Sequence, residues 1–132
     1  MKTLKQFLKS QPEIIFAYLF GSRAKGTVHA LSDTDIAIYI HRGALLSAEA
    51  QAYGYIPSLL AKLPKRLQKQ TIDIVILNQT PILLRHRCLY DGTLLFTKDK
   101  RLLTKLKVQT LLEYLDTKPL REKIHRGLYE KK

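Results

Sequence analysis

The stretch Ile14-Ile-Phe-Ala-Tyr-Leu-Phe-Gly-Ser22, followed after ten residues by Asp33-Thr-Asp-Ile-Ala-Ile-Tyr-Ile40, decides the fold of this chain. Two apolar runs flank a Gly-Ser pair and two acidic residues, a pattern that predicts a strand, a turn and a second strand. Side chains alternate faces along a strand, so Asp33 and Asp35 should point the same way, and Ile36, Ile38 and Ile40 should point to the opposite face, the expected core. The stretch therefore predicts a turn that can hold a phosphate group, next to two carboxylates that can bind a metal ion. This combination suits the binding of a metal-bound nucleoside triphosphate.

The chemistry of these residues supports that interpretation. Two carboxylates side by side repel each other and weaken a sheet, whereas a bound divalent cation removes the repulsion, and magnesium prefers oxygen ligands. Gly21 allows a ligand to approach the backbone closely. Ser22 adds a hydroxyl group, and a helix starting there would direct free N–H groups at an anion. Asp-x-Asp pairs and Gly-Ser dipeptides are each common in ordinary turns, and it is their combination at this spacing that favours a functional site.

A third carboxylate lies in the apolar run Thr71-Ile-Asp-Ile-Val-Ile-Leu77, which also predicts a strand. Asp73 is the only charged residue in this run, and a charge there is costly unless it is paired or bound to a metal. The alternative is that Asp73 belongs to an exposed edge strand. Three carboxylates on adjacent strands would suit two-metal phosphoryl or nucleotidyl transfer.

Gly21-Ser22, Asp33, Asp35 and a strand-borne Asp73 together resemble the nucleotidyltransferase superfamily that includes DNA polymerase beta. The run Tyr18-Leu-Phe-Gly-Ser-Arg-Ala-Lys-Gly26 with Ser32-Asp-Thr-Asp35 resembles its small bacterial branch, the minimal nucleotidyltransferases (MNT). Thr34 departs from that pattern, in which an aliphatic residue usually separates the two aspartates. Further stretches resemble the MNT antitoxins of HEPN–MNT toxin–antitoxin pairs: Leu84-Arg-His-Arg87, Asp91-Gly-Thr-Leu-Leu-Phe96, Glu113-Tyr-Leu-Asp116 and Lys118-Pro-Leu120.

The resemblance implies an α+β, polymerase beta-like nucleotidyltransferase fold, with helices packed on a small mixed β-sheet. It implies a magnesium-dependent protein adenylyltransferase that moves AMP from ATP to a tyrosine hydroxyl of its cognate HEPN ribonuclease toxin and so blocks the toxin's RNA site. The expected cofactors are two Mg²⁺ ions, with ATP as co-substrate. The expected catalytic and metal-binding residues are Asp33, Asp35 and Asp73, and the expected nucleotide-binding residues are Gly21, Ser22 and Arg23.

Three alternatives remain open at this stage. The chain could neutralise a toxin by binding and occlusion only, or it could modify a small molecule as aminoglycoside nucleotidyltransferases do, or it could extend an RNA end. The formal net charge of +12 is large for 132 residues, and a basic surface attracts triphosphates, nucleic acid or an acidic protein alike. Direct nucleic-acid binding is the less favoured of these expectations.

Length and composition predict one domain, residues 1–132, large enough to bury a sizeable core. No apolar stretch approaches the roughly 20 residues that a membrane-spanning helix needs. Cys88 is the single cysteine, which excludes an internal disulfide and fits a reducing, cytoplasmic location. We expect its side chain to be a small buried hydrophobic group.

The remaining elements are predicted as supports for the site. A first helix should span Lys2 to Lys9. Thr80 should cap a helix that has Pro81 at its first position and continues to about Tyr90, and a last strand should follow at Thr93 to Thr97.

The C-terminal segment, residues 99–132, is predicted to be a helix and a tail that contact a partner. At about 100° per residue, Leu102, Leu103 and Leu106 share one face of a helix over Asp99 to Leu115. Four other apolar residues lie on roughly the opposite face, namely Val108, Leu111, Leu112 and Leu115. A helix that is apolar on two sides is buried on both or contacts a partner with one.

Overall fold

The computed structural model describes residues 2–21, 34–47, 54–68 and 71–130, and it describes side chains as far as residue 126. The helices are α1 (Lys2–Ser10), α2 (Arg42–Leu45), α4 (Tyr55–Ala61), α5 (Ile82–Asp91), α6 (Lys100–Asp116) and α7 (Lys118–Glu130), with a short 3-10 turn, η1 (Leu77–Gln79). The strands are β1 (Ile14–Phe20), β2 (Thr34–Ile40), β3 (Ile72–Ile76) and β4 (Thr93–Thr97). None of the described helices is long and apolar enough to cross a membrane.

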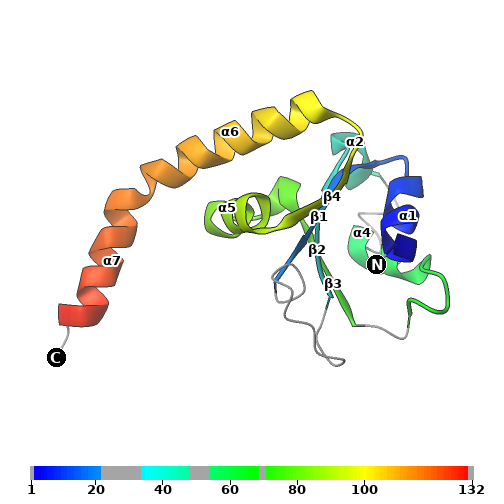
Figure 1. Cartoon of the computed structure of the whole chain (residues 1–132), viewed down its shortest axis with the longest axis horizontal. Coiled ribbons are helices and arrows are strands. Elements are labelled where there is room, and N and C mark those ends of the chain that lie inside the picture. The colour runs from blue at the N-terminus through cyan, green and yellow to red at the C-terminus, as the bar shows by residue number, and fades with distance from the viewer. Residues whose placement is uncertain (1, 22–33, 48–53, 69–70, 131–132) are drawn as a thin grey trace.

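The four strands form one mixed sheet in the order β3-β2-β1-β4. β1 is antiparallel to both of its neighbours, β2 and β4, whereas β2 and β3 run parallel. The sheet, with helices packed against it (Figure 1), is the α+β architecture that the sequence predicts. Among the described strands, β3 lies at an edge of the sheet, so the strand that carries Asp73 pairs with β2 alone.

Both faces of the sheet are covered by helices, and each face carries a buried apolar cluster. One face packs the isoleucines of β2 and β3 against the buried Leu4 and Leu8 of α1 and Leu59 of α4. On the other face a second buried cluster joins the sheet to α5 and α6 through Phe16, Tyr18, Ala37, Leu77, Cys88, Leu89 and Leu103. Asp35 alternates with Ile36 along β2 and so lies on the α5 side. Asp35 and its partner in register, Asp73, therefore lie on the same face of the sheet as the second buried cluster.

The start of α5 also differs from its prediction. Pro81, not Thr80, is the residue before the first helical position. The hydroxyl of Thr80 instead donates a hydrogen bond to the carbonyl of Ile76, at 2.6 Å. The 3-10 turn causes this difference, since it brings Thr80 back over the end of β3, where its 8% exposed side chain finds a partner inside the fold.

The C-terminal arm, which we define as α6 and α7, extends from the sheet along α5 and then bends so that α7 projects beyond the rest of the fold (Figure 1). Asp99 caps α6, its side chain accepting a hydrogen bond from the N–H of Leu102 at 3.0 Å. Residues 118–130, expected as a tail, form the helix α7. Pro119 is compatible with this helix because it lies in the first turn, where a missing N–H costs little.

Candidate active site

Two of the predicted catalytic carboxylates lie side by side in the sheet. Asp35 of β2 is paired in register with Asp73 of β3, and the two strands run parallel. Neighbouring strands are about 4.8 Å apart and paired residues share a face, so these two carboxylates project together from the face that α5 and α6 cover. The side chain of Asp35 is half-buried and that of Asp73 is exposed. The pair therefore opens to solvent at the edge of the sheet.

Gly21 lies directly against this acidic pair. It follows the last residue of β1, Phe20, which is paired with Asp35 on the antiparallel neighbour. Its backbone has a φ of 79°, in the left-handed region that favours glycine. A Cβ atom at this position would overlap Oδ2 of Asp35. Both the backbone conformation and the close approach to Asp35 thus require glycine here.

The C-terminal end of α5 packs beside the site. Cys88 is fully buried and free, as the sequence predicts. Burial raises the pKa of its thiol to about 11, with a smaller opposing contribution from Arg87 and a smaller supporting one from Asp35. At Gly92, just past the helix, a Cβ atom would overlap the carbonyl oxygen of Cys88 and lie 3.0 Å from that of Leu19. This close packing holds α5 against β1, next to Gly21.

The structure thus brings together three of the six predicted site residues: Gly21, Asp35 and Asp73. Ser22, Arg23 and Asp33 lie outside the described residues. Thr34, the departure from the family pattern, is 1% exposed and faces the core of isoleucines. A threonine is therefore accommodated between the two aspartates because its side chain points away from the acidic face.

The acidic pair has the right chemistry for a hard divalent cation. Both side chains supply carboxylate oxygens, the ligand type that magnesium prefers. Two such carboxylates in register repel unless a cation lies between or beside them. Within residues 2–21, 34–47, 54–68 and 71–130, no group of three or more His, Cys, Asp or Glu side chains is placed to share an ion. The described part of the site therefore offers a pair of carboxylates.

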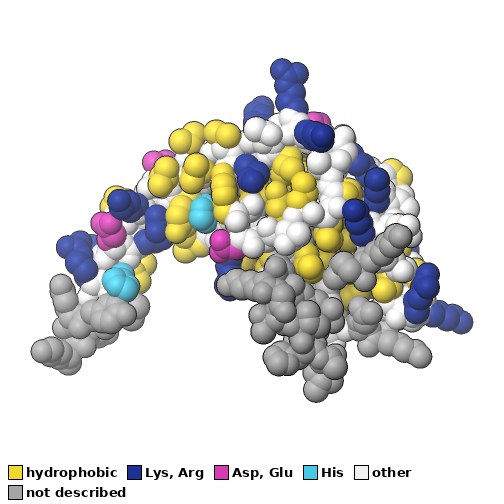
Figure 2. Space-filling view, in the orientation of Figure 1, with side chains coloured by type: hydrophobic (Ala, Val, Ile, Leu, Met, Phe, Trp, Pro, Cys, Tyr) yellow, Lys and Arg dark blue, Asp and Glu magenta, His cyan; other side chains and the backbone are white. Residues whose placement is uncertain are grey.

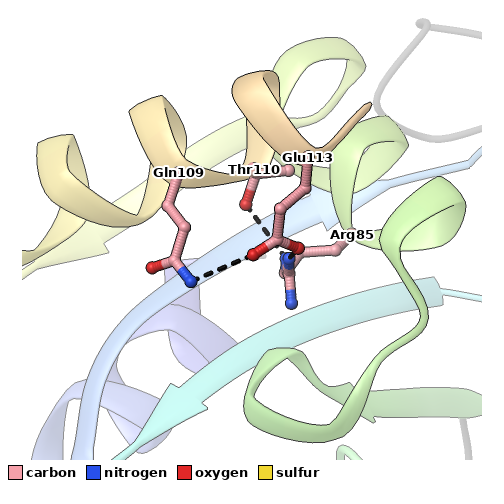
Figure 3. A network of polar contacts seen from close by, with 4 residues as sticks. All are labelled: Arg85, Gln109, Thr110 and Glu113. Atoms are coloured by element: carbon pink, nitrogen blue, oxygen red, sulfur yellow. Dashed lines mark hydrogen bonds and ion pairs between the residues drawn. The ribbon is translucent and has the colours of Figure 1, made fainter. Parts of the chain in front are cut away.

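A polar network that the sequence did not predict joins α5 to α6 (Figure 3). Arg85 forms an ion pair with Glu113, and its Nε donates a hydrogen bond to the hydroxyl of Thr110 at 3.0 Å. Gln109 donates to the other oxygen of Glu113, also at 3.0 Å. Thr110 is fully buried, although it is polar. The network fixes the position of α6 relative to α5, the helix that packs beside the acidic pair.

An aromatic stack next to this network links α5 to both helices of the arm. The ring of His86 lies parallel to that of Tyr114, with centroids 3.6 Å apart, and it also stacks with the ring of Tyr90, whose centroid is 4.9 Å away. The guanidinium of Arg121 in α7 lies 3.9 Å from the centre of the Tyr114 ring. The stretches Leu84–Arg87 and Glu113–Asp116, singled out in the sequence for their resemblance to antitoxins, therefore contact each other in space.

Two kinds of known protein are similar to almost the whole chain. The protein adenylyltransferase MntA of Aphanizomenon flos-aquae (strain 2012/KM1/D3) is 29% identical over 118 residues, which cover 87% of this chain and 78% of that protein. A chain in the crystal structure of a toxin–antitoxin complex with AMP-PNP matches with a TM-score of 0.72 and 22% identity, covering 97% of both chains. A chain in the structure of a tri-AMPylated Shewanella oneidensis HEPN toxin with an MNT antitoxin matches with a TM-score of 0.64 and 20% identity, covering 98% of this chain and 99% of the other.

These structural similarities establish the fold, and a match to a family model establishes the family. Residues 2–101 match the model of the polymerase beta nucleotidyltransferase domain. This span contains the four strands and the whole acidic site, including the positions that sequence reasoning assigned to metal and triphosphate. The chain therefore belongs to the polymerase beta nucleotidyltransferase family.

Proposed function

We propose that this chain is an antitoxin that transfers AMP from ATP to a tyrosine hydroxyl of its cognate HEPN ribonuclease toxin and thereby neutralises it. The observation that carries the proposal is the in-register pair of Asp35 and Asp73 with Gly21 packed against it, in a chain of the nucleotidyltransferase family. The similarity to the adenylyltransferase MntA supports a protein acceptor. In this proposal the chain acts in the cytoplasm, where ATP and the RNA substrates of a ribonuclease are present.

In the proposed reaction, the oxygen of the acceptor hydroxyl bonds to the α-phosphorus of ATP, the bond from that phosphorus to the bridging oxygen breaks, and pyrophosphate leaves. Asp35, Asp73 and Asp33 would hold two Mg²⁺ ions, which supply positive charge for the phosphate oxygens. Asp73, whose carboxylate is exposed, would also help to accept the proton of the acceptor hydroxyl. The turn that begins at Gly21, with Ser22 and Arg23, would hold the β- and γ-phosphates.

The experiment is coexpression with a candidate HEPN-type toxin, chosen from any adjacent reading frame that encodes one, followed by mass spectrometry of that toxin. The wild-type chain should add the mass of one or more AMP groups, and Asp33→Ala combined with Asp35→Ala should abolish the addition. Asp99→Asn is the matched control, because asparagine also caps a helix and Asp99 lies at the start of α6. AMP transfer by the double variant would refute the mechanism.

Neutralisation by binding alone is the second candidate, and the exposed apolar face of α6 favours it. The same double variant distinguishes the two functions. If it protects cells from the toxin without adding AMP, occlusion is sufficient for neutralisation. If cells die although the complex still forms, transfer is required.

A further inference from the structure

The second apolar face of α6, predicted from the sequence, is exposed in the structure. Val108, Leu111, Leu112 and Leu115, which we call the apolar stripe, are 52%, 37%, 59% and 51% exposed. The opposite face of the same helix is covered, with Leu103 buried and Leu106 half-buried against the second core. In α7, Leu120 and Ile124 are also more than half exposed. Figure 2 shows hydrophobic side chains gathered along the arm. Contiguous apolar surface of this kind marks an interaction site.

The arm lies beyond the catalytic domain of the family. The family model ends at residue 101, next to the first residue of α6, Lys100. The similarity to chains from toxin–antitoxin complexes continues over 97% of this chain and so includes most of the arm. The arm is thus an addition to the nucleotidyltransferase domain that this chain has in common with chains found in such complexes.

The contacts between α5 and α6 hold the apolar stripe in a fixed orientation. The ion pair of Arg85 with Glu113 and the stacking of His86 on Tyr114 both lie on the covered side of α6. Tyr90 adds a hydrogen bond from its hydroxyl to the carbonyl of Lys107, at 2.7 Å. A preorganised surface loses little conformational entropy when a partner binds. The stripe is therefore suited to docking a folded partner.

Among protein occupants, the charge of the chain favours an acidic partner over a second copy. The net charge is +12, and within residues 100–130 Lys and Arg outnumber Asp and Glu eight to four. Two copies of so basic a chain repel each other, whereas an acidic protein is attracted. A second copy is consequently a poor occupant of the stripe, and a protein with an apolar patch rimmed by carboxylates is a good one.

We propose that the apolar stripe of α6, extended by Leu120 and Ile124 of α7, is the surface on which the toxin docks, separate from the acidic site that modifies it. This inference rests on the proposed function for the identity of the partner. It assigns to the arm the task of holding the toxin, and to residues 2–101 the task of transferring AMP.

The test measures the affinity of the full chain for the purified HEPN-type toxin without ATP, so that docking is observed apart from transfer. Leu112→Asp combined with Leu115→Asp should weaken binding at least about thirtyfold, as hot-spot residues do. The uncharged pair Leu112→Ser and Leu115→Ser should weaken it about tenfold. Leu46→Asp is the matched control, because Leu46 is 68% exposed but lies outside the arm. It should leave the affinity within about twofold of wild type.

Each outcome bears on the inference. All variants should keep the wild-type thermal shift with AMP-PNP and Mg²⁺, which reports a folded catalytic domain. Unchanged toxin affinity in both leucine pairs would overturn the inference, as would a wild-type chain that does not bind the toxin. If light scattering shows a wild-type dimer that the leucine variants dissociate, the occupant is a second copy and the inference fails. A chain that binds through the stripe but transfers no AMP would refute the proposed function and leave the docking surface standing.

Discussion

At the scale of single residues, Gly21 links the backbone conformation to the chemistry of the site. Gly21→Ala places a side chain on a left-handed backbone and against the carboxylate of Asp35. We expect a loss of about 1–3 kcal/mol in the free energy of unfolding and at least about a tenfold loss in the rate of AMP transfer, because the displaced carboxylate belongs to the proposed reacting centre. Urea unfolding and single-turnover transfer to the toxin measure the two effects.

Gly54→Ala is a matched control for that substitution. Gly54 also has a left-handed φ, of 81°. A Cβ atom there would lie 3.4 Å from Cδ of Pro57, an ordinary contact distance, and neither Asp35 nor Asp73 is among its near neighbours. It should carry a similar backbone penalty and leave the transfer rate per folded molecule unchanged. If Gly54→Ala slows transfer as much as Gly21→Ala does, backbone strain alone explains the loss, and the contact with Asp35 has no special role.

The individual site residues also show how much of the site the sequence could predict. The alternation of side chains predicted that Asp35 and the isoleucines of β2 face opposite ways, and the structure confirms it. The pairing of Asp35 with Asp73 depends on the parallel register of β2 and β3, which the sequence of either strand alone does not contain. The motif therefore predicts a set of site residues, and the register of the sheet shows that two of them, Asp35 and Asp73, are paired.

At the scale of elements, the stacking of His86 with Tyr90 and with Tyr114 should make the packing of the arm sensitive to pH. Burial, the largest effect, lowers the pKa of His86, and Arg121 lowers it further, whereas Asp91 opposes the change. The folded chain thus takes up a proton at this ring less readily than the unfolded chain, whose histidine titrates near 6.5. The contribution of His86 to the free energy of unfolding should therefore be fully present above about pH 7, and it should decline as the pH falls through 6.5.

Urea unfolding between pH 8 and pH 5 measures this dependence. His86→Phe keeps an aromatic ring in the stack and removes the titrating group, so part of the decline with falling pH should disappear. His125→Phe, on the exposed surface of α7, leaves the stack intact and should retain the full decline. An identical pH profile for His86→Phe and the wild type would show that the ring of His86 does not contribute.

Elements were predicted well where one periodic pattern dominates. β1 and β4 begin and end where their apolar runs do, and α6 was placed within a residue. α7 was expected as a tail because Pro119 and many charged residues obscure its period, although a proline is acceptable in the first turn. The ion pair of Arg85 with Glu113 could not be predicted, since it joins two helices whose packing the sequence pattern leaves open. Its only signal was that both residues lie in stretches resembling antitoxins.

At the scale of the whole molecule, the excess of positive charge should control how fast the toxin arrives, while the apolar stripe controls how long it stays. A net charge of +12 attracts an acidic partner over distances comparable with the Debye length, which shrinks from about 10 Å at 0.1 M salt to about 3 Å at 1 M. We expect the association rate constant to fall at least about tenfold between 50 mM and 500 mM NaCl. The dissociation rate constant should change little, because burial of leucine side chains does not depend on charge screening.

Biolayer interferometry of the full chain with the HEPN-type toxin separates the two rate constants. Reversing two exposed charges at the start of the arm, with Arg101→Glu and Lys105→Glu, should slow association and flatten its dependence on salt, with dissociation nearly unchanged. Leu112→Asp with Leu115→Asp should do the opposite, since it accelerates dissociation most strongly. An association rate that is flat across the salt range would mean that the basic surface does not guide the toxin, and that the charge of this chain serves another ligand, such as ATP.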